Sequence, residues 1–175
     1  IVTMHTPLNE TTRGMADRHF FSMMRPGAFF INASRGEVVC DDALKEAIPK
    51  LGPVIIDTWN HEPDIDLELM DMVAIATPHI AGYSYQGKQN GTAAAVRAVA
   101  HYFGIQSLYE FFPKTDLPEN DAVKLDLKGL NQGEIAAVLQ YNYPIFTDDF
   151  MLRVAPEDFD KLRAEYKYRR EVYID

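Results

Sequence analysis

Short apolar runs, separated by polar stretches that contain glycine and proline, dominate the first half of this 175-residue sequence. Runs of four or five apolar residues between turn residues are typical of buried strands. We therefore predict strands over residues 1–5, 28–32, 53–57 and 72–76. The run at 28–32 is apolar at successive positions, which is typical of a parallel strand that is covered on both faces.

Helical patterns lie between and after these strands. Short helices are predicted over 16–24, 41–48 and 65–70, and a long helix over 84–103. Proline and glycine end the first two of these segments, as expected at helix ends. Strands that alternate with helices at this spacing favour an α/β fold with a parallel sheet.

Residues 106–175 differ in composition from the part before them. They carry 11 of the 20 aromatic side chains, an enrichment typical of a packed or interfacial module rather than a linker. A short strand over 122–127, a helix over 133–140 capped by Asn131, and a last helix opened by Pro156 are predicted there. A small α+β appendage with a core of its own is one interpretation, and a surface for assembly is the other.

Charge and cysteine content exclude several classes of protein. The formal net charge of -9 disfavours a nucleic-acid-binding surface. Cys40 is the only cysteine, so neither a disulfide framework nor a thiolate zinc cluster is expected, and a cytoplasmic location is favoured. The sequence has no leader pattern and no long apolar run, so we expect neither secretion nor membrane insertion.

Polar residues follow each predicted strand, where a parallel sheet presents its carboxyl edge. Thr6 follows the first strand, Asn32 to Gly36 end the second, Asp57 ends the third and His79 follows the fourth. Ligands of open α/β sheets bind at this edge. The sequence therefore predicts a site that these four loops share.

Three of the edge residues have side chains suited to acid-base chemistry on an organic acid. Arg35 offers a fixed fork of donors that matches a carboxylate, and His79 can exchange a proton near neutral pH. Glu62, on the loop after the third strand, could bind one ring nitrogen of His79 and fix its tautomer. Such a trio needs no metal, and the spacing of the other histidines shows no zinc motif.

Each residue also has an ordinary structural interpretation. Arg35 could pair with a surface carboxylate, Glu62 could be a solvated loop residue, and Asp57 could cap the turn that follows it. The joint arrangement of carboxylate, guanidinium and imidazole at neighbouring strand ends favours the catalytic interpretation.

Four motifs in order resemble the NAD-dependent D-2-hydroxyacid dehydrogenase family, and the resemblance extends from residue 1 to about 105. The motifs are His5-Thr6-Pro7-Leu8, Ile31 through Val39 with Ser34-Arg35-Gly36 at its centre, Asp57-Thr58-Trp59 through Glu62-Pro63, and Pro78-His79-Ile80-Ala81-Gly82. The resemblance implies a Rossmann-like doubly wound parallel sheet, of which residues 1–105 would be the C-terminal half.

The resemblance also implies a role for each site residue. Arg35 would hold the substrate carboxylate and 2-oxygen, His79 would accept or donate the proton, and Glu62 would orient His79. The residues expected to bind NAD are Thr6, Ala33, Ser34, Arg35, Asp57 and Gly82, and those expected to contact substrate are Arg35, His79 and Tyr83.

The glycine-rich phosphate loop of the family and its ribose-reading acidic residue would lie before Ile1. We therefore expect this sequence to be the carboxyl-terminal part of a dehydrogenase. Alone, it should bind NAD weakly and be inactive.

Two further segments, 82–92 and 159–171, resemble one branch of the family, which acts on a small phosphorylated 2-hydroxy acid. That resemblance implies that 106–175 form a dimerisation domain, and thus a homodimer. Phe159, Leu162 and Tyr166, and less regularly Tyr173, fall near one face of the last helix, which we expect at the interface. Another D-2-hydroxyacid dehydrogenase, such as one acting on phosphoglycerate, and a non-catalytic dimerising module are the alternatives.

Overall fold

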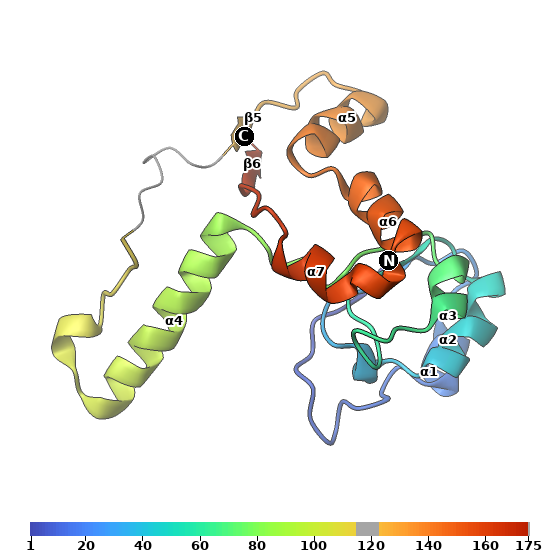
Figure 1. The fold of residues 1–175 in the computed structure, drawn as a ribbon, viewed down its shortest axis with the longest axis horizontal. Helices are drawn as coiled ribbons and strands as arrows, with labels where there is room; N and C mark the ends of the chain where they lie inside the picture. Colours follow the sequence, from blue (N-terminus) through green and yellow to red (C-terminus); the bar gives the residue numbers. More distant parts are fainter. Residues whose placement is uncertain (115–122, 175) are drawn as a thin grey trace. The chain divides into compact units, whose positions relative to one another are not determined.

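The computed structural model describes residues 1–114 and 123–174, which divide into two compact units (Figure 1). The first unit comprises Ile1–Ala81 and Ile145–Tyr166, and the second comprises Gly82–Pro144 and Lys167–Asp175. This division does not coincide with the predicted boundary between residues 105 and 106. The reason is that a helix from the tail packs on the sheet of the first unit, whereas the long helix after His79 belongs to the second.

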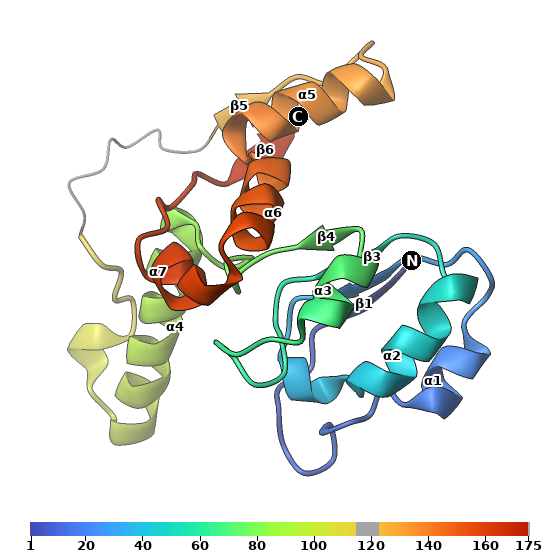
Figure 2. The same ribbon diagram turned by 45° about the vertical axis from the view of Figure 1, so that its right-hand side comes forward.

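A four-stranded parallel sheet forms the centre of the first unit, which confirms the predicted α/β class (Figure 2). Its strands lie in the order β1 (Val2–Met4), β2 (Phe30–Asn32), β3 (Val54–Ile56) and β4 (Ile75–Ala76). All four occur where the apolar runs predicted them, although each is shorter than its run. The parallel direction brings the residues after each strand to one edge of the sheet.

Helices α1 (Arg18–Met23), α2 (Asp41–Ala47) and α3 (Leu67–Met72) lie side by side against the sheet (Figure 2). Asp17 and Asp66 cap α1 and α3 with their side chains. Short 3₁₀ turns occur at Gly36–Val38 and Ile48–Lys50. The core between helices and sheet is apolar and includes Phe21, Phe30, Leu44, Ile56, Trp59 and Leu69.

Helices α6 (Ile145–Val154) and α7 (Phe159–Ala164), with a 3₁₀ turn at Pro156–Asp158 between them, complete the first unit. On α6, a carboxylate oxygen of Asp149 accepts the backbone N–H of Ala76 in the edge strand β4 at 2.6 Å. Arg153 binds Asp149 and donates to the carbonyl oxygens at the end of α3. An edge strand is thereby covered by a helix, which removes an open edge for pairing.

The prediction that Phe159 lies at an interface on the last helix is wrong. Phe159 has no exposed surface and belongs to the core of the first unit, with Leu162 packed against that core. Tyr166 is half-buried, and its hydroxyl donates to Asp148 at 3.0 Å. Tyr173 lies in a strand rather than on the helix.

The second unit is built around the 19-residue helix α4 (Tyr85–Phe103). The side chain of Ser84 caps its start, and Gly104, at φ 71°, ends it in the left-handed conformation that glycine favours. A 3₁₀ turn at Gln106–Leu108 follows, and β5 (Val123–Leu125) pairs in parallel with β6 (Val172–Ile174). Helix α5 (Gln132–Asn142) has the predicted capping box of Asn131 and Glu134.

Residue 122, the first of the predicted strand 122–127, lies outside the described residues. Within the described ranges, no helix is both long and apolar enough to span a membrane. The same ranges contain no cluster of three or more His, Cys, Asp and Glu side chains that could hold a metal ion.

Candidate active site

The loop that follows β2 is shaped by a side chain that the sequence analysis did not single out. Asn32 is buried, and its amide nitrogen donates to the carbonyl oxygens of Arg35 and Thr58 at 3.0 and 3.4 Å. Its amide oxygen accepts both the backbone N–H and the hydroxyl of Ser34. A buried polar residue at the end of an apolar strand was the signal available in the sequence. Asn32 fixes the backbone on which Ala33, Ser34 and Arg35 are presented.

Arg35 is exposed at this edge, and its Nη1 donates to the Ser34 carbonyl oxygen at 2.6 Å. Across the residues that the structure describes, its guanidinium makes no ion pair. The next residue, Gly36, lies so close to the Trp59 backbone that an added Cβ would be 1.9 Å from a backbone carbon. Glycine therefore allows the Arg35 loop to approach the loop after β3.

The structure brings Glu62 and His79 together. His79 Nδ1 and a Glu62 carboxylate oxygen are 2.8 Å apart, and about a fifth of each side chain is exposed. The other carboxylate oxygen of Glu62 accepts the backbone N–H of Trp59 at 2.8 Å. A carboxylate held in this way presents one fixed oxygen to the imidazole and favours the tautomer with a proton on Nδ1.

His79 itself occupies the left-handed region of backbone conformation, with φ at 57°. A residue with a Cβ is strained there unless its surroundings hold it in place. Its N–H donates to the carbonyl oxygens of Asp57 and Thr77 at 2.8 and 3.0 Å. Neighbouring strand ends thus fix the backbone of the histidine.

Asp57 holds the His79 loop from the adjacent strand. One of its carboxylate oxygens accepts the Thr77 hydroxyl at 2.7 Å and the Ile80 and Ala81 N–H groups at 2.8 and 3.1 Å. The second oxygen receives the Ala81 N–H at 3.1 Å. Burial raises the pKa of Asp57, although the hydrogen bonds from Thr77, Ile80 and Ala81 act in the opposite direction.

Trp59 links the two loops that carry Glu62 and His79, and the sequence analysis gave it no role of its own. Its indole Nε1 donates to the carbonyl oxygen of Thr77 at 2.9 Å, and the residue is only 4% exposed. Trp59 thus binds Glu62 through its backbone N–H and the His79 loop through its indole, and it holds both in position.

Two side chains at this edge offer hydrogen-bonding capacity that no other described residue uses. The hydroxyl oxygens of Thr6, after β1, and Thr58, after β3, are buried and lack a hydrogen-bond partner in the described parts of the chain. Buried polar groups are rarely left without a partner. Together with the second carboxylate oxygen of Asp57, they fit a ligand that has amide and hydroxyl groups, such as a nicotinamide nucleotide.

Gly82 and Tyr83 belong to the second unit, and their contacts with cofactor and substrate stay predictions. An added Cβ at Gly82 would meet nothing within 4 Å, so packing there does not require glycine. Tyr83 is half-buried, and its ring packs edge to face on Tyr168 with centroids 5.5 Å apart.

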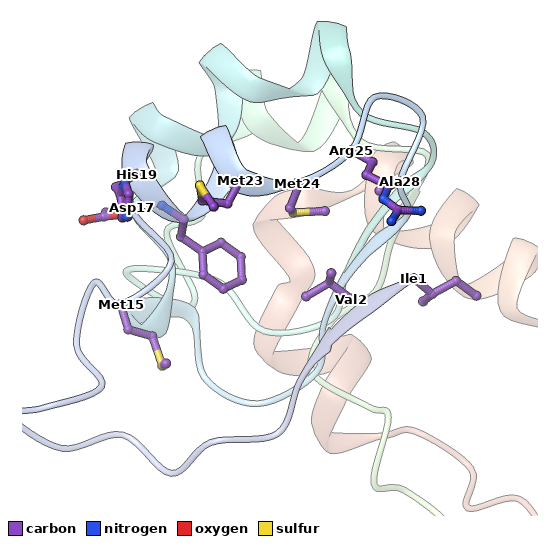
Figure 3. A pocket seen from close by; sticks show the side chains of 10 residues that line it. Ile1, Val2, Met15, Asp17, His19, Met23, Met24, Arg25 and Ala28 are labelled. Carbon is purple, nitrogen blue, oxygen red and sulfur yellow. Dashed lines mark hydrogen bonds between the residues drawn. The ribbon is translucent and has the colours of Figure 1, made fainter.

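A separate hollow of about 670 Å³ lies beside β1 and α1 (Figure 3). Its lining is mostly apolar, with Met15, Met23 and Met24 among the side chains that surround it, and it includes none of the predicted site residues. Asp17, His19 and Arg25 also line it, beside the apolar side chains.

The part of the chain that carries this site is similar to a known protein family. Residues 1–81 match the family described as D-isomer specific 2-hydroxyacid dehydrogenase, NAD binding domain. The match ends two residues after His79 and contains Arg35, Glu62 and His79.

Similar curated proteins are the erythronate-4-phosphate dehydrogenases of Bacteroides fragilis and Yersinia pestis. They are 40% and 37% identical to this chain, over 98% of the chain and 48% of their own length. The chain thus spans about half the length of the curated relatives it matches. Among solved structures, D-lactate dehydrogenase of Aquifex aeolicus, complexed with NAD and lactic acid, aligns with a TM-score of 0.50 and 26% identity. That alignment covers 64% of this chain and 41% of the dehydrogenase.

Proposed function

Because residues 1–81 belong to the family of D-isomer specific 2-hydroxyacid dehydrogenases, we propose that the whole protein transfers a hydride between 4-phospho-D-erythronate and NAD. Oxidation would give 2-oxo-3-hydroxy-4-phosphobutanoate, a step of pyridoxal 5'-phosphate biosynthesis. The erythronate-4-phosphate dehydrogenases that match 98% of the chain support this choice of substrate. The observation that carries the chemistry is the 2.8 Å contact between His79 and Glu62.

His79 is the acid-base group in this proposal. Glu62 holds the proton on Nδ1, so Nε2 carries the lone pair that removes the proton from the 2-hydroxyl group of the substrate. NAD, held by the residues proposed below, would supply the acceptor for the hydride that leaves C2 as the C–O bond becomes a carbonyl. The imidazolium that forms is stabilised by the Glu62 carboxylate, and it returns the proton when the reaction runs in reverse.

Arg35 orients the substrate. Its guanidinium has donors beyond the one that binds the Ser34 carbonyl oxygen, and these can hold the substrate carboxylate and 2-oxygen. Positioning by such a fork reduces the entropy lost in reaching the reactive geometry.

The NAD contacts are proposed for residues at the carboxyl edge of the sheet and directly after it. Asp57 would accept a hydrogen bond from the nicotinamide carboxamide through its second oxygen, and the unpartnered Thr6 hydroxyl would face the cofactor. Ala33, Ser34, Arg35 and Gly82 complete the proposed set.

We propose that the protein is a homodimer and that residues 106–175 contribute the interface. Helix α6 supports this, because Phe146, Phe150 and Val154 are each about 60% exposed and lie four residues apart on one face. Three large apolar side chains in a row on a helix are typical of a contact surface. A cytoplasmic location is also proposed, since a single cysteine suits a reducing compartment.

The test is an assay of the whole protein with NAD and 4-phospho-D-erythronate, D-3-phosphoglycerate and D-lactate in parallel. We expect kcat/KM to be highest for 4-phospho-D-erythronate. A higher value for D-3-phosphoglycerate would replace the proposed substrate, and no NADH with any of the three would overturn the proposed activity.

A further inference from the structure

An asparagine joins the two loops of the first unit that carry Arg35 and Glu62. Residues 33–40, between β2 and α2, form the Arg35 loop, and residues 57–66, between β3 and α3, form the Glu62 loop. The amide nitrogen of Asn60 donates to the carbonyl oxygen of Val39 at 3.1 Å and to the carboxylate of Asp41 at 2.7 Å. Both N–H donors of the Asn60 amide therefore cross from the Glu62 loop to the end of the Arg35 loop and the first residue of α2.

The backbones of the two loops also touch. An added Cβ at Gly36 would lie 1.9 Å from the carbonyl carbon of Trp59 and 2.3 Å from the backbone nitrogen of Asn60. The N–H of the same tryptophan binds Glu62 at 2.8 Å. Trp59 therefore contacts the Arg35 loop with its carbonyl group and holds Glu62 with its N–H. A shift of one loop against the other would move Arg35 relative to Glu62.

Pairing of the strands does not extend into these loops. Where β2 and β3 end, the N–H of Asp57 donates to the carbonyl oxygen of Asn32 at 2.9 Å. Beyond that point, the amide nitrogen of Asn32 lies 3.4 Å from the Thr58 carbonyl oxygen. This distance is longer than the roughly 2.7–3.2 Å usual for N–H···O hydrogen bonds, so the contact is weak. The two bonds of Asn60 are shorter and hold the loops together farther from the sheet.

Asp41 gives Asn60 a charged acceptor at the start of α2. The residue is half-buried, and burial raises the pKa of its carboxyl, whereas the hydrogen bond from Asn60 lowers this pKa. A hydrogen bond to an ionised carboxylate is stronger than one between neutral groups. The contact thus favours the ionised form of Asp41, and the ionised form strengthens the contact.

The acid-base pair is held by contacts that do not include Asn60. Glu62 binds the Trp59 N–H within its own loop, and the N–H of His79 donates to the Asp57 carbonyl oxygen at 2.8 Å. Glu62 and His79 are joined to each other at 2.8 Å. These bonds hold the loops after β3 and β4 together, and Asn60 joins them to the Arg35 loop.

We propose that Asn60 is a positioning residue that sets the distance between Arg35 and the acid-base group His79. The inference rests on the proposed function, in which one substrate must reach Arg35 with its carboxylate and His79 with its 2-hydroxyl group at once. Reacting groups misplaced by about 1 Å can lose roughly a hundredfold in rate. A contact that limits movement between the two loops therefore acts on turnover.

The kinetic test is Asn60→Ala in the whole protein, which removes both donors. We expect kcat to fall roughly tenfold or more and KM to change less than about twofold, because Arg35 still binds the substrate carboxylate. The midpoint of the pH dependence of kcat/KM should stay at its wild-type value, since the bond between Glu62 and His79 is intact. Lower stability with wild-type kcat would overturn the positioning role. A shifted midpoint would also overturn it, because Asn60 would then act on the acid-base pair itself.

Matched variants separate the hydrogen bonds from the shape of the side chain. Asn60→Asp retains the shape but directs an oxygen at Val39 and Asp41, so kcat should fall at least as far as in Asn60→Ala. Addition of Asp41→Asn supplies a donor from the opposite side and should recover part of the lost kcat. Wild-type kcat in Asn60→Asp would show that the N–H donors are not needed. Arg18→Met removes the ion pair with Glu46, which joins α1 to α2 in the same unit, and should leave kcat unchanged.

Two features of the experiment separate this inference from the proposed function. First, kcat is compared with whichever of 4-phospho-D-erythronate, D-3-phosphoglycerate and D-lactate the whole protein oxidises. Second, amide hydrogen exchange without substrate tests the contact between the loops. Exchange of the hydrogen-bonded amides of Val38, Val39 and Trp59 should be faster in Asn60→Ala than in the wild type.

The outcomes are distinct. No NADH from any of the three acids would overturn the proposed function, and the positioning role with it. If one acid is oxidised and Asn60→Ala changes neither kcat nor exchange, the positioning role is overturned and the dehydrogenase activity stands. A lower kcat together with faster exchange supports both.

Discussion

The indole nitrogen of Trp59 donates a hydrogen bond to the carbonyl oxygen of Thr77 at 2.9 Å, inside the core. Trp59 precedes Glu62 by three residues, and Thr77 precedes His79 by two. One buried contact therefore joins the two loops that carry the proposed acid-base pair.

Trp59→Phe should lower both stability and turnover. The phenyl ring retains most of the packing, but the buried Thr77 carbonyl oxygen loses its donor, which costs about 1–3 kcal/mol. Because the His79 loop is then less firmly held, kcat should fall while KM changes little. Urea denaturation and steady-state kinetics measure the two effects. Tyr102→Phe, at an exposed position on α4, is the matched control. A variant with wild-type stability and turnover would show that the hydrogen bond from Trp59 does not hold the His79 loop in position.

His79→Asn should reduce kcat of the whole protein by roughly a hundredfold or more, the usual loss for a general acid-base group. Glu62→Gln should reduce kcat less, because the amide oxygen can still accept a hydrogen bond from Nδ1. Since the two residues act as a unit, the double variant should be no slower than His79→Asn alone. NAD affinity, followed by calorimetry, should be retained in all three. Fully additive losses would contradict the pairing of Glu62 with His79.

Asp57→Asn should change how stability depends on pH. Burial raises the pKa of Asp57 above its ordinary value of 3.8. The folded protein therefore binds this proton more tightly than the unfolded chain, and the contribution to stability falls as the pH rises through the raised pKa. Asparagine does not titrate, so the free energy of unfolding of the variant minus that of the wild type should increase between about pH 4 and about pH 7. Urea denaturation at both pH values measures this difference. A constant difference would show that burial does not disfavour the ionised form of Asp57.

Phe150→Asp should convert a dimer of the whole protein to monomer. Phe150 is exposed between Phe146 and Val154 on α6, so its replacement should leave the fold intact. Two-fold symmetry would place the new charge in the interface twice. Sedimentation velocity measures the change, and circular dichroism verifies folding. Leu67→Asp, at a half-exposed position on α3, is the control and should remain dimeric. A folded Phe150→Asp dimer would place the interface elsewhere. Phe159 does not test the interface, because its side chain is in the core.

The sequence determined the parts of this protein that depend on local pattern. Apolar runs of strand length and the helices between them predicted the parallel sheet, since burial on both faces leaves a continuous apolar signature. Polar residues after each strand predicted a common edge, because parallel strands end on the same side. Asn131 and Glu134 predicted the start of α5, because a capping box is a contact within one turn.

Only the tertiary structure decided the contacts between residues far apart in the chain. Asp149 on α6 meets Ala76 in β4 across 73 residues, and Phe159 enters the core of the sheet unit, so part of the tail belongs with the strands. The periodicity of the last helix placed Phe159 on an apolar face, but it did not show which surface that face packs against. Likewise, no periodic signal in the sequence indicates two further contacts, the hydrogen bond from Ser84 to Glu171 and the one from Trp59 to Thr77. Local preference acts over a few residues, whereas these contacts depend on which surfaces are left to bury once the chain has folded.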